Sequence, residues 1–360
     1  MKIKYIGNFN DGTGWAKAAT YKALALDYAG YDVYCEELKY NNVSIVMEDK
    51  ITQLLDKKTD KYDIVIQHVL PSEYKYYPGV KNIGVFELDT LNLSNQLWLK
   101  KLSMMDEIFV PTSICKDALI SSGLKTPIKI FPHLFNYEKI SNLTKVAEIS
   151  ELNSAFNFVF VGEFSKQKNL ESLLRAFHCE FDYVEPVNLY IKTEKDLKTV
   201  EDFCGAVKER LKKIGKYKKE VLVTSYMPDQ ILWSTLSQCH CFVMPSYGDA
   251  WCYPAMEASA MGIPVIYTAG TGLEEYCDSA TRVNSIEEHC YGALDSVEGL
   301  YSSNDLWLEP SVKHMQYIMR SIYDTFMQNR DVYMSYREKQ SEHMKYYDYK
   351  NGKNFERITI

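Results

Sequence analysis

The feature that most constrains the fold is an alternation of short apolar strands with helical segments, which runs along the chain twice. In the first half we expect strands at Lys2–Gly7, Asp32–Cys35, Tyr62–Ile66, Asn82–Phe86, Glu107–Val110 and Ile128–Phe131. The first helix is expected over Trp15–Gly30, where small and apolar residues recur at helical spacing. Strands that alternate with helices predict a parallel sheet covered on both faces.

The alternation stops after Pro132 and then restarts. Residues 136–154 are polar and lack strand periodicity, so we expect a linker there. The second series predicts strands at Phe156–Val161, Val187–Ile191, Val221–Thr224 and Cys241–Met244, with helices at Asn169–Cys179, Lys198–Ile214 and Asp229–Ser237. From about Pro310 the chain has helical periodicity. A chain of 360 residues has room for two such doubly wound domains.

Composition is that of a globular protein, with 46% hydrophobic and 25% charged residues. No apolar run approaches the roughly 20 residues of a membrane span, and the start reads as a strand rather than an export signal. Nine cysteines without paired zinc spacing predict reduced thiols in the cytoplasm and no metal site. A net charge of −7 argues against a generally basic nucleic-acid binder. The basic run Lys208–Lys219 is either a solvated helix and turn or a contact for an anionic membrane or acceptor.

One stretch, Cys241–Tyr276, combines a buried strand, a loop, a short helix, a second strand and a Gly-rich turn. Pro254 suits the first position of the helix because its missing N–H is not needed there. This places Asp249 on the loop and Glu257 in the first helical turn. The backbone N–H groups of residues 250–256 are expected to converge at one place, where the helix dipole favours an anion.

This stretch resembles the nucleotide-sugar motif of retaining glycosyltransferases of family four, which have the GT-B fold. That family shows Pro-Ser, then Glu, Gly-Phe-Gly, a Pro and Glu-Ala, with two glutamates separated by seven residues. The matching residues here are Pro245-Ser246, Asp249, Pro254 and Glu257-Ala258. Asp249 replaces the first glutamate, and Ala-Trp-Cys replaces Gly-Phe-Gly.

The resemblance implies an α/β protein of the GT-B type, with two doubly wound Rossmann-like domains facing a central cleft. Residues 1–137 would form the acceptor domain and residues 138–330 the nucleotide-sugar donor domain. A tail from about 331 to 360 would cross back to the first domain.

The implied activity moves a sugar from a nucleotide diphosphate sugar, with UDP favoured, to an acceptor hydroxyl with retention of configuration. No cofactor or obligatory metal is expected. The alternatives are a non-catalytic sugar- or nucleotide-binding homologue and a sugar-nucleotide epimerase of the same fold. The acceptor is open between a glycan, a lipid, a protein, a small molecule and a modified DNA base. Peripheral membrane contact and the oligomeric state are open as well.

The resemblance also implies roles in donor binding. Glu257 would hold the ribose hydroxyls and Asp249 a sugar hydroxyl. A capping box is the alternative for Glu257, but Pro254, three residues before it, offers no capping oxygen. The backbone expected to meet the diphosphate and sugar is that of Ala250, Trp251, Cys252 and Tyr253.

A second donor loop, VGEFSKQKN at 161–169, follows the first strand of the second half. The family reads Val-Gly-Arg and then a lysine five residues later, and both cations neutralise the diphosphate. Lys168 matches the lysine, with a solvated loop lysine as the alternative. Glu163 stands at the arginine position. Three explanations are open: Glu163 points away from the diphosphate, a cation such as Lys166 compensates its charge, or it binds a sugar hydroxyl. Tyr226 and Met227 match the family's loop against the nucleotide base.

Three loops of the first half carry further candidates. Gly14, before the first helix, matches a loop near the donor phosphate and the acceptor, or forms a tight turn. His68 follows a buried strand and is an acid, a base, a hydrogen-bond donor or a satisfied structural histidine. Glu87 stands where many family members place a histidine; with Asp89 it binds sugar hydroxyls or lies on a surface loop. His133 begins the linker. The residues expected at the chemistry are Glu87, Asp249, Lys168 and His68.

Overall fold

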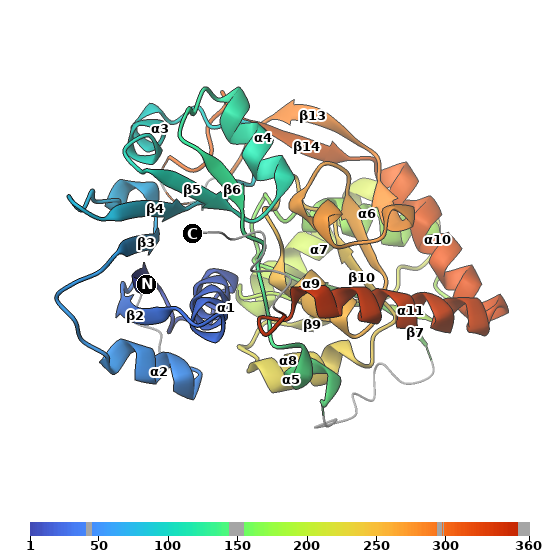
Figure 1. Ribbon diagram of the computed structural model, residues 1–360. Helices are drawn as coiled ribbons and strands as arrows, with labels where there is room; N and C mark the ends of the chain where they lie inside the picture. Colours follow the sequence, from blue (N-terminus) through green and yellow to red (C-terminus); the bar gives the residue numbers. More distant parts are fainter. Residues whose placement is uncertain (41–44, 144–154, 294–296, 298, 352–360) are drawn as a thin grey trace. The chain divides into compact units, whose positions relative to one another are not determined.

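Two six-stranded parallel sheets, one in each half of the chain, carry the fold of this computed structural model (Figure 1). The structure describes residues 1–40, 45–143, 155–293, 297 and 299–351. By its internal contacts the chain divides into a first unit, Met1–Tyr137 with Lys345–Ile360, and a second unit, Glu138–Met344. Most of the predicted linker, residues 144–154, lies outside the described residues.

The first unit has the strand order β2-β1-β3-β4-β5-β6. Its strands are β1 (Lys2–Gly7), β2 (Asp32–Glu37), β3 (Ile64–His68), β4 (Lys81–Val85), β5 (Glu107–Val110) and β6 (Ile128–Ile130). Its helices are α1 (Gly14–Tyr28), α2 (Asp49–Asp56), α3 (Gln96–Leu102) and α4 (Ser113–Ser121), and α5 (Tyr137–Ser141) crosses into the second unit. The predicted strands are confirmed, but β3 extends further than expected. His68 is therefore the last residue of a buried strand rather than the first of a loop.

The second unit has the strand order β12-β11-β10-β7-β8-β9. Its sheet contains β7 (Phe156–Val161), β8 (Val187–Lys192), β9 (Val221–Val223), β10 (Cys241–Met244), β11 (Val265–Thr268) and β12 (Arg282–Val283). Its helices are α6 (Leu170–Glu180), α7 (Leu197–Leu211), α8 (Asp229–Leu236), α9 (Tyr253–Ala260), α10 (Val312–Gln328) and α11 (Arg330–Met344). The antiparallel hairpin of β13 (Ser285–His289) and β14 (Leu306–Pro310) was not foreseen.

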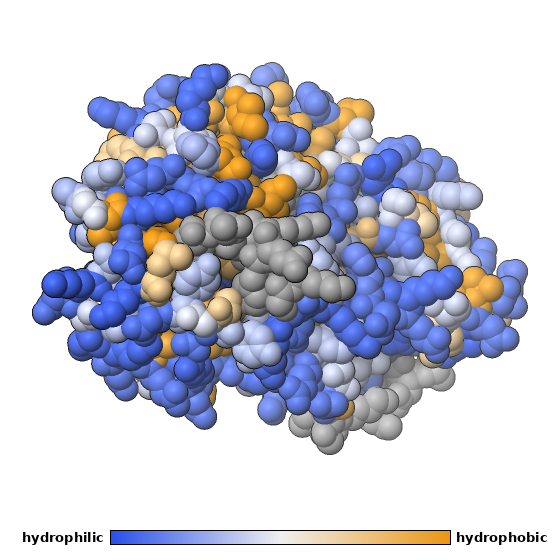
Figure 2. All heavy atoms as spheres, in the orientation of Figure 1, coloured by the Kyte–Doolittle hydropathy of each residue, from blue (hydrophilic) through white to orange (hydrophobic). Residues whose placement is uncertain are grey.

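Apolar side chains gather in the sheets, and every residue of β7 and β10 is buried. Hydrophilic residues cover most of the face shown in Figure 2. None of the described helices combines the length and apolar character that crossing a bilayer requires.

Helix α11 belongs to the second unit because it packs against the end of α9. Gly262 has φ +74°, and a Cβ there would lie 2.3 Å from the carbonyl oxygen of Arg337. The Arg337 guanidinium donates to the Met261 carbonyl at 3.0 Å, and Ser341 Oγ donates to the Ala260 carbonyl at 2.7 Å. The expected tail of 331–360 was therefore too long, since only the part from Lys345 clusters with the first unit.

The contact at Gly262 predicts a specific loss of stability. Gly215, in the same unit, also has a positive φ (+114°), but no atom lies within 4 Å of a Cβ built there. Both Gly→Ala variants should lose about 1 kcal/mol from the left-handed backbone. Gly262→Ala should lose about 1–3 kcal/mol more from overpacking against α11. Chemical unfolding measures the difference, and equal losses would contradict the close packing of α11 on α9.

Candidate functional site

The donor loops of the second unit follow β7 and β10, which are neighbours in the sheet. The strand order reverses at this pair, because β8 continues from β7 on one side and β11 from β10 on the other. In doubly wound sheets, ligands bind outside the carboxyl ends of the strands at such a reversal. The topology therefore places both predicted donor loops where a ligand site is expected.

Buried amide side chains fix these two loops to each other. Gln167 Nε2 donates to the Gly248 carbonyl, and Asn169 Nδ2 donates to the Pro245 carbonyl at 3.0 Å. The Tyr247 N–H donates back to the Gln167 carbonyl at 2.8 Å. Asn169 also caps α6 from a left-handed backbone with φ +56°, which asparagine tolerates better than most residues. The loops form one rigid structure rather than two independent segments.

Lys168 and Asp249, one from each loop, form an ion pair with Nζ and Oδ2 2.6 Å apart. The side chains are 20% and 7% exposed, so water screens the pair only partly. Asp249 Oδ1 also accepts the Trp251 N–H at 3.4 Å. The interpretation of Lys168 as a merely solvated lysine is therefore wrong, while its role toward a diphosphate stays a prediction.

The turn between Asp249 and α9 has little freedom. Cys252 takes a left-handed conformation with φ +71°. The Gly272 N–H donates to the Asp249 carbonyl at 2.7 Å, and a Cβ on Gly272 would lie 2.0 Å from the Ala250 carbonyl oxygen. The Tyr276 hydroxyl donates to the Trp251 carbonyl at 2.6 Å and lies 3.0 Å from that of Cys252. Contacts from residues 270–276 therefore hold this turn in one conformation.

Two details of the predicted anion site need correction. Helix α9 begins at Tyr253, so Glu257 lies beyond its first turn, where its side chain is 2% exposed. The Met256 N–H bonds to the Cys252 carbonyl, and the Trp251 N–H is directed to Asp249. These two N–H groups already have acceptors in the protein, so fewer than expected remain for an anion.

Other predicted donor residues lie nearer the surface. Glu163, at the arginine position, is exposed, which reduces its cost beside an anion. The Lys166 ammonium lies 5.2 Å from the centre of the Tyr247 ring. Tyr226 is 63% exposed, and Met227 is half-buried beside it on the loop between β9 and α8. Nothing in their contacts tests a role against a nucleotide base.

Lys192 is a cation near the donor loops that was not predicted as a site residue. It ends β8, where its register partner is Val161, the last residue of β7. Its side chain is 7% exposed, and its ammonium lies 3.4 Å from Glu194 Oε1. A lysine at the end of a mostly apolar strand could have identified this residue from the sequence.

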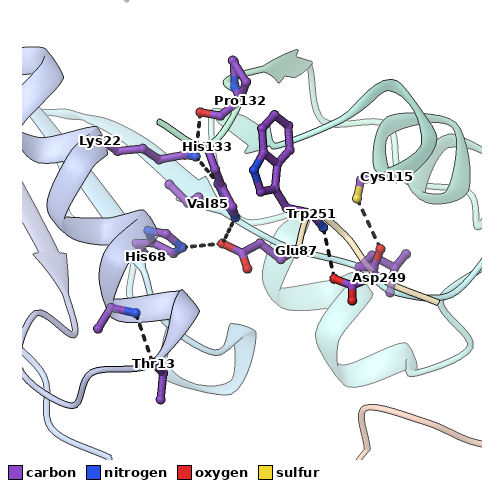
Figure 3. A network of polar contacts seen from close by, with 12 residues as sticks. Thr13, Lys22, His68, Val85, Glu87, Cys115, Pro132, His133, Asp249 and Trp251 are labelled. Atoms are coloured by element: carbon purple, nitrogen blue, oxygen red, sulfur yellow. Dashed lines mark hydrogen bonds and ion pairs between the residues drawn. The ribbon is translucent and has the colours of Figure 1, made fainter. Parts of the chain in front are cut away.

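The first unit holds a chain of polar contacts around Glu87 (Figure 3). Glu87 Oε1 lies 2.9 Å from His68 Nε2 and 3.0 Å from His133 Nε2. The second nitrogen of His133 lies 2.6 Å from Lys22 Nζ, and that of His68 lies 2.9 Å from the Tyr5 hydroxyl. The side chains come from α1, β1, the end of β3, and the segments after β4 and β6.

These contacts are consistent with one set of protonation states. An ammonium and a phenol can both donate, so each histidine accepts at Nδ1 and donates its Nε2–H to Glu87. Burial, and then the charge of Lys22, lower the pKa of His133 to about 4. Burial also lowers the pKa of His68, which outweighs its hydrogen bond to Glu87. Both histidines are therefore neutral near pH 7.

Glu87 remains a carboxylate in this setting. Burial alone would raise its pKa, but the hydrogen bonds that the two histidines donate outweigh burial and hold the pKa well below its usual range. The Glu87 side chain is 22% exposed, so it reaches the surface of the unit. Such a group accepts hydrogen bonds and does not serve as a general acid near pH 7.

Lys22 is the other charge of this cluster and was not predicted. It is fully buried in α1, donates to the Pro132 carbonyl at 3.0 Å, and lies 4.9 Å from the centre of the Phe131 ring. Burial lowers its pKa to about 7. A lysine within the apolar stripe of a helix was the available signal. The sequence places His133 near the start of the linker, but its contact with Glu87 requires the tertiary fold.

The loop before α1 has the tight-turn structure given as the alternative for Gly14. Thr13 Oγ1 caps the helix by accepting the Ala16 N–H at 3.2 Å, and Asp11 Oδ1 accepts the Thr13 N–H at 2.9 Å. Gly12, with φ +74°, is the glycine that the turn requires, whereas Gly14 is the first residue of the helix. A role for Gly14 at a phosphate stays a prediction.

Comparison with known proteins decides the enzyme class. Residues 144–284 match the family model described as "Glycosyl transferases group 1". Residues 144–284 therefore resemble the glycosyl transferases group 1 family. The predicted class, a glycosyltransferase, is confirmed, while the finer assignment to family four is matched only approximately. No curated protein matches the chain by sequence.

Solved glycosyltransferase structures share the fold of the whole chain. Sucrose-phosphate synthase from Thermosynechococcus elongatus is 14% identical, with a TM-score of 0.62 over 97% of this chain and 95% of that one. A trehalose-6-phosphate synthase, studied for glycosyl transfer with retention, is 11% identical, with a TM-score of 0.63 over 97% and 96%. Anabaena HepE, in complex with UDP and glucose, is 11% identical, with a TM-score of 0.60 over 97% and 96%. At these identities the likeness shows the fold, and the predicted GT-B architecture is confirmed.

The buried ammonium of Lys22 predicts a pH dependence of stability. Its pKa is about 7 in the folded protein, against an ordinary value of 10.5. Between these values the unfolded chain binds the extra proton, so stability should rise with pH, by at most about 1.4 kcal/mol per pH unit. The difference in unfolding free energy between the wild type and Lys22→Met should be constant below pH 7 and grow above it.

Unfolding at a series of pH values measures this difference. Lys17→Met, on the same helix but half-exposed, is the matched control for loss of an ammonium group. A difference that stays flat between about pH 7 and pH 10 would show that Lys22 keeps an ordinary affinity for its proton.

Proposed function

We propose that this protein transfers a sugar from a nucleotide diphosphate sugar, with UDP as the favoured nucleotide, to an acceptor hydroxyl with retention of configuration. The observation that carries the proposal is the family match over residues 144–284, which includes both donor loops and Glu257. A structural neighbour, HepE, is in complex with UDP and glucose, which supports the choice of donor. The cytoplasmic location stays a prediction.

The main electrostatic task in such a reaction is to stabilise the charge that develops on the leaving diphosphate. In this proposal Lys168 supplies a positive charge at the site, and the start of α9 supplies backbone N–H groups and a favourable dipole. Lys192, at the end of β8, supplies further positive charge in place of the family's arginine. Glu163 is exposed and does not oppose the diphosphate strongly.

The two acids of the second unit have separate tasks. Glu257 accepts hydrogen bonds from the ribose hydroxyls, which anchors the nucleotide. Asp249 is positioned by Lys168 and by the Trp251 N–H, and it accepts a hydroxyl of the donor sugar. Because the ion pair fixes Asp249 before the ligand enters, its side chain loses little conformational entropy when the ligand binds.

Glu87 of the first unit binds a sugar hydroxyl in the same proposal. Its carboxylate stays ionised because two neutral histidines donate to one of its oxygens. A fixed acceptor of this kind selects for a hydroxyl, since an analogue without that hydroxyl would leave a partly buried charge unmatched. His68 and His133 are then positioning residues rather than proton carriers.

Release of the nucleotide measures the proposed activity directly. The purified chain, incubated with UDP- and GDP-sugars and mixed acceptors, should release UDP. Glu257→Gln should raise the KM for the donor about tenfold, as expected for loss of a hydrogen bond to a charged group. Lys168→Met should lower kcat by about 10²-fold, because charge stabilisation is lost in the transition state.

Glu220→Gln is the matched control, because Glu220 is also a buried carboxyl of the second unit but is bound to His178 and Lys208. It should leave the kinetics unchanged. Donor binding without release would instead support the non-catalytic homologue, and conversion of the donor sugar without an acceptor would support the epimerase. The anomeric configuration of the product, read by NMR, tests retention.

Metal chelation provides an independent test of this charge arrangement. If lysines and backbone N–H groups stabilise the diphosphate, UDP release should persist after treatment with EDTA. The same preparation with added Mg²⁺ or Mn²⁺ is the control and should show less than a twofold change. A loss of activity in EDTA that metal restores would contradict the proposal, because a metal would then be the main counter-charge.

A further inference from the structure

Two neighbouring loops of the second unit carry an exposed basic and apolar surface that the transfer reaction does not use. One loop joins α6 to β8, and the other joins α7 to β9. Because β8 and β9 are adjacent, the loops meet at the amino edge of the sheet, opposite the donor loops. The Lys213 ammonium links them by donating to the Phe181 carbonyl at 2.8 Å.

The second loop is basic in an acidic protein. Residues 208–219 contain seven basic residues and one acid, in a chain of net charge −7. The ammonium groups of Lys216 and Lys218 lie 5.6 and 5.9 Å from the centre of the Tyr183 ring on the first loop. Lys212 and Lys219 are exposed beside them.

Three apolar or aromatic side chains are exposed on these two contacting loops. Ile214 is 99% exposed, Val184 86% and Tyr183 52%. A single exposed apolar residue is ordinary, but three on contacting loops within a group of lysines are not scattered at random. We call these three residues, with Lys212, Lys216 and Lys218, the lysine surface.

The backbone holds Ile214 in its outward position. Lys212, the residue that caps the end of α7, has φ +49°, and Gly215 follows with φ +114°, so the chain reverses around Ile214. The Tyr217 hydroxyl fixes this reversal by accepting the Lys213 N–H at 2.7 Å and donating to the Lys208 carbonyl at 2.9 Å. The exposure of Ile214 is therefore built into the loop.

Nearby acids are matched by other cations and leave the surface positive. Asp182 lies 3.3 Å from Lys213, and Glu220 lies 2.8 Å from Lys208. Glu185 is 2.6 Å from Arg320 on α10. These three carboxylates are thus engaged at the border of the surface, and the one acid within residues 208–219, Glu209, is exposed among seven basic residues.

We propose that the lysine surface docks this protein on an anionic lipid membrane. Lysines are attracted to the negative headgroups, and an exposed isoleucine and valine between them gain free energy only by entering an apolar phase. A nucleic acid would satisfy the lysines but offers no such phase to Val184 and Ile214, so the membrane is favoured. Because the donor loops lie at the opposite edge of the sheet, docking leaves them accessible.

Vesicle co-sedimentation of the full chain tests the proposal. The wild type should bind phosphatidylcholine–phosphatidylglycerol vesicles, with weaker binding as salt rises, and should not bind phosphatidylcholine alone. Replacing Lys216 and Lys218 by Gln should lower the partition coefficient about fivefold per lysine. Replacing Ile214 and Val184 by Ser should lower it about tenfold for the pair.

Helix α11 supplies matched controls, because Val332 and Lys339 are exposed in the same unit. Val332→Ser and Lys339→Gln should bind vesicles like the wild type. All variants should keep the circular dichroism and UDP release of the wild type, which separates this proposal from the transfer reaction. Absence of salt-sensitive binding to anionic vesicles, binding only to DNA or RNA, or equal effects of the control substitutions would overturn it.

Discussion

The hydrogen bonds between the loops after β7 and β10 are the interactions on which the donor site depends. Gln167 and Asn169 bind carbonyl groups of the opposite loop, so the backbone before Asp249 has one position relative to Lys168. Gly272 then allows the 270–276 segment to approach within hydrogen-bonding distance of the turn. Without these contacts, Lys168, Asp249 and the start of α9 would be charged or polar groups on separate flexible segments.

Each unit keeps a carboxylate ionised near an apolar core. In the second unit Asp249 has a direct ammonium partner in Lys168. In the first unit Glu87 receives two N–H donors from neutral histidines, and the amino group of Lys22, whose pKa is about 7, lies one residue further along the chain of contacts. This second arrangement polarises the carboxylate without a direct ion pair, so its charge stays available to a ligand hydroxyl.

The sequence predicted the fold well because hydrophobic periodicity and strand–helix alternation are local signals. The motif around Asp249 and Glu257 also identified the donor loops, since proline and glycine positions determine the local backbone. The Glu87 cluster could not be assembled in this way, because Lys22 and His133 are separated by 111 residues and meet only when the sheet forms. Likewise, the contacts that place α11 in the second unit, among them the close approach at Gly262, join residues far apart in the sequence.

A crystal structure of the chain with bound UDP would test the central claim most directly. The account predicts the diphosphate at the start of α9 within reach of Lys168, and the ribose hydroxyls bonded to the Glu257 carboxylate. A nucleotide bound away from α9, or one whose ribose makes no contact with Glu257, would contradict it.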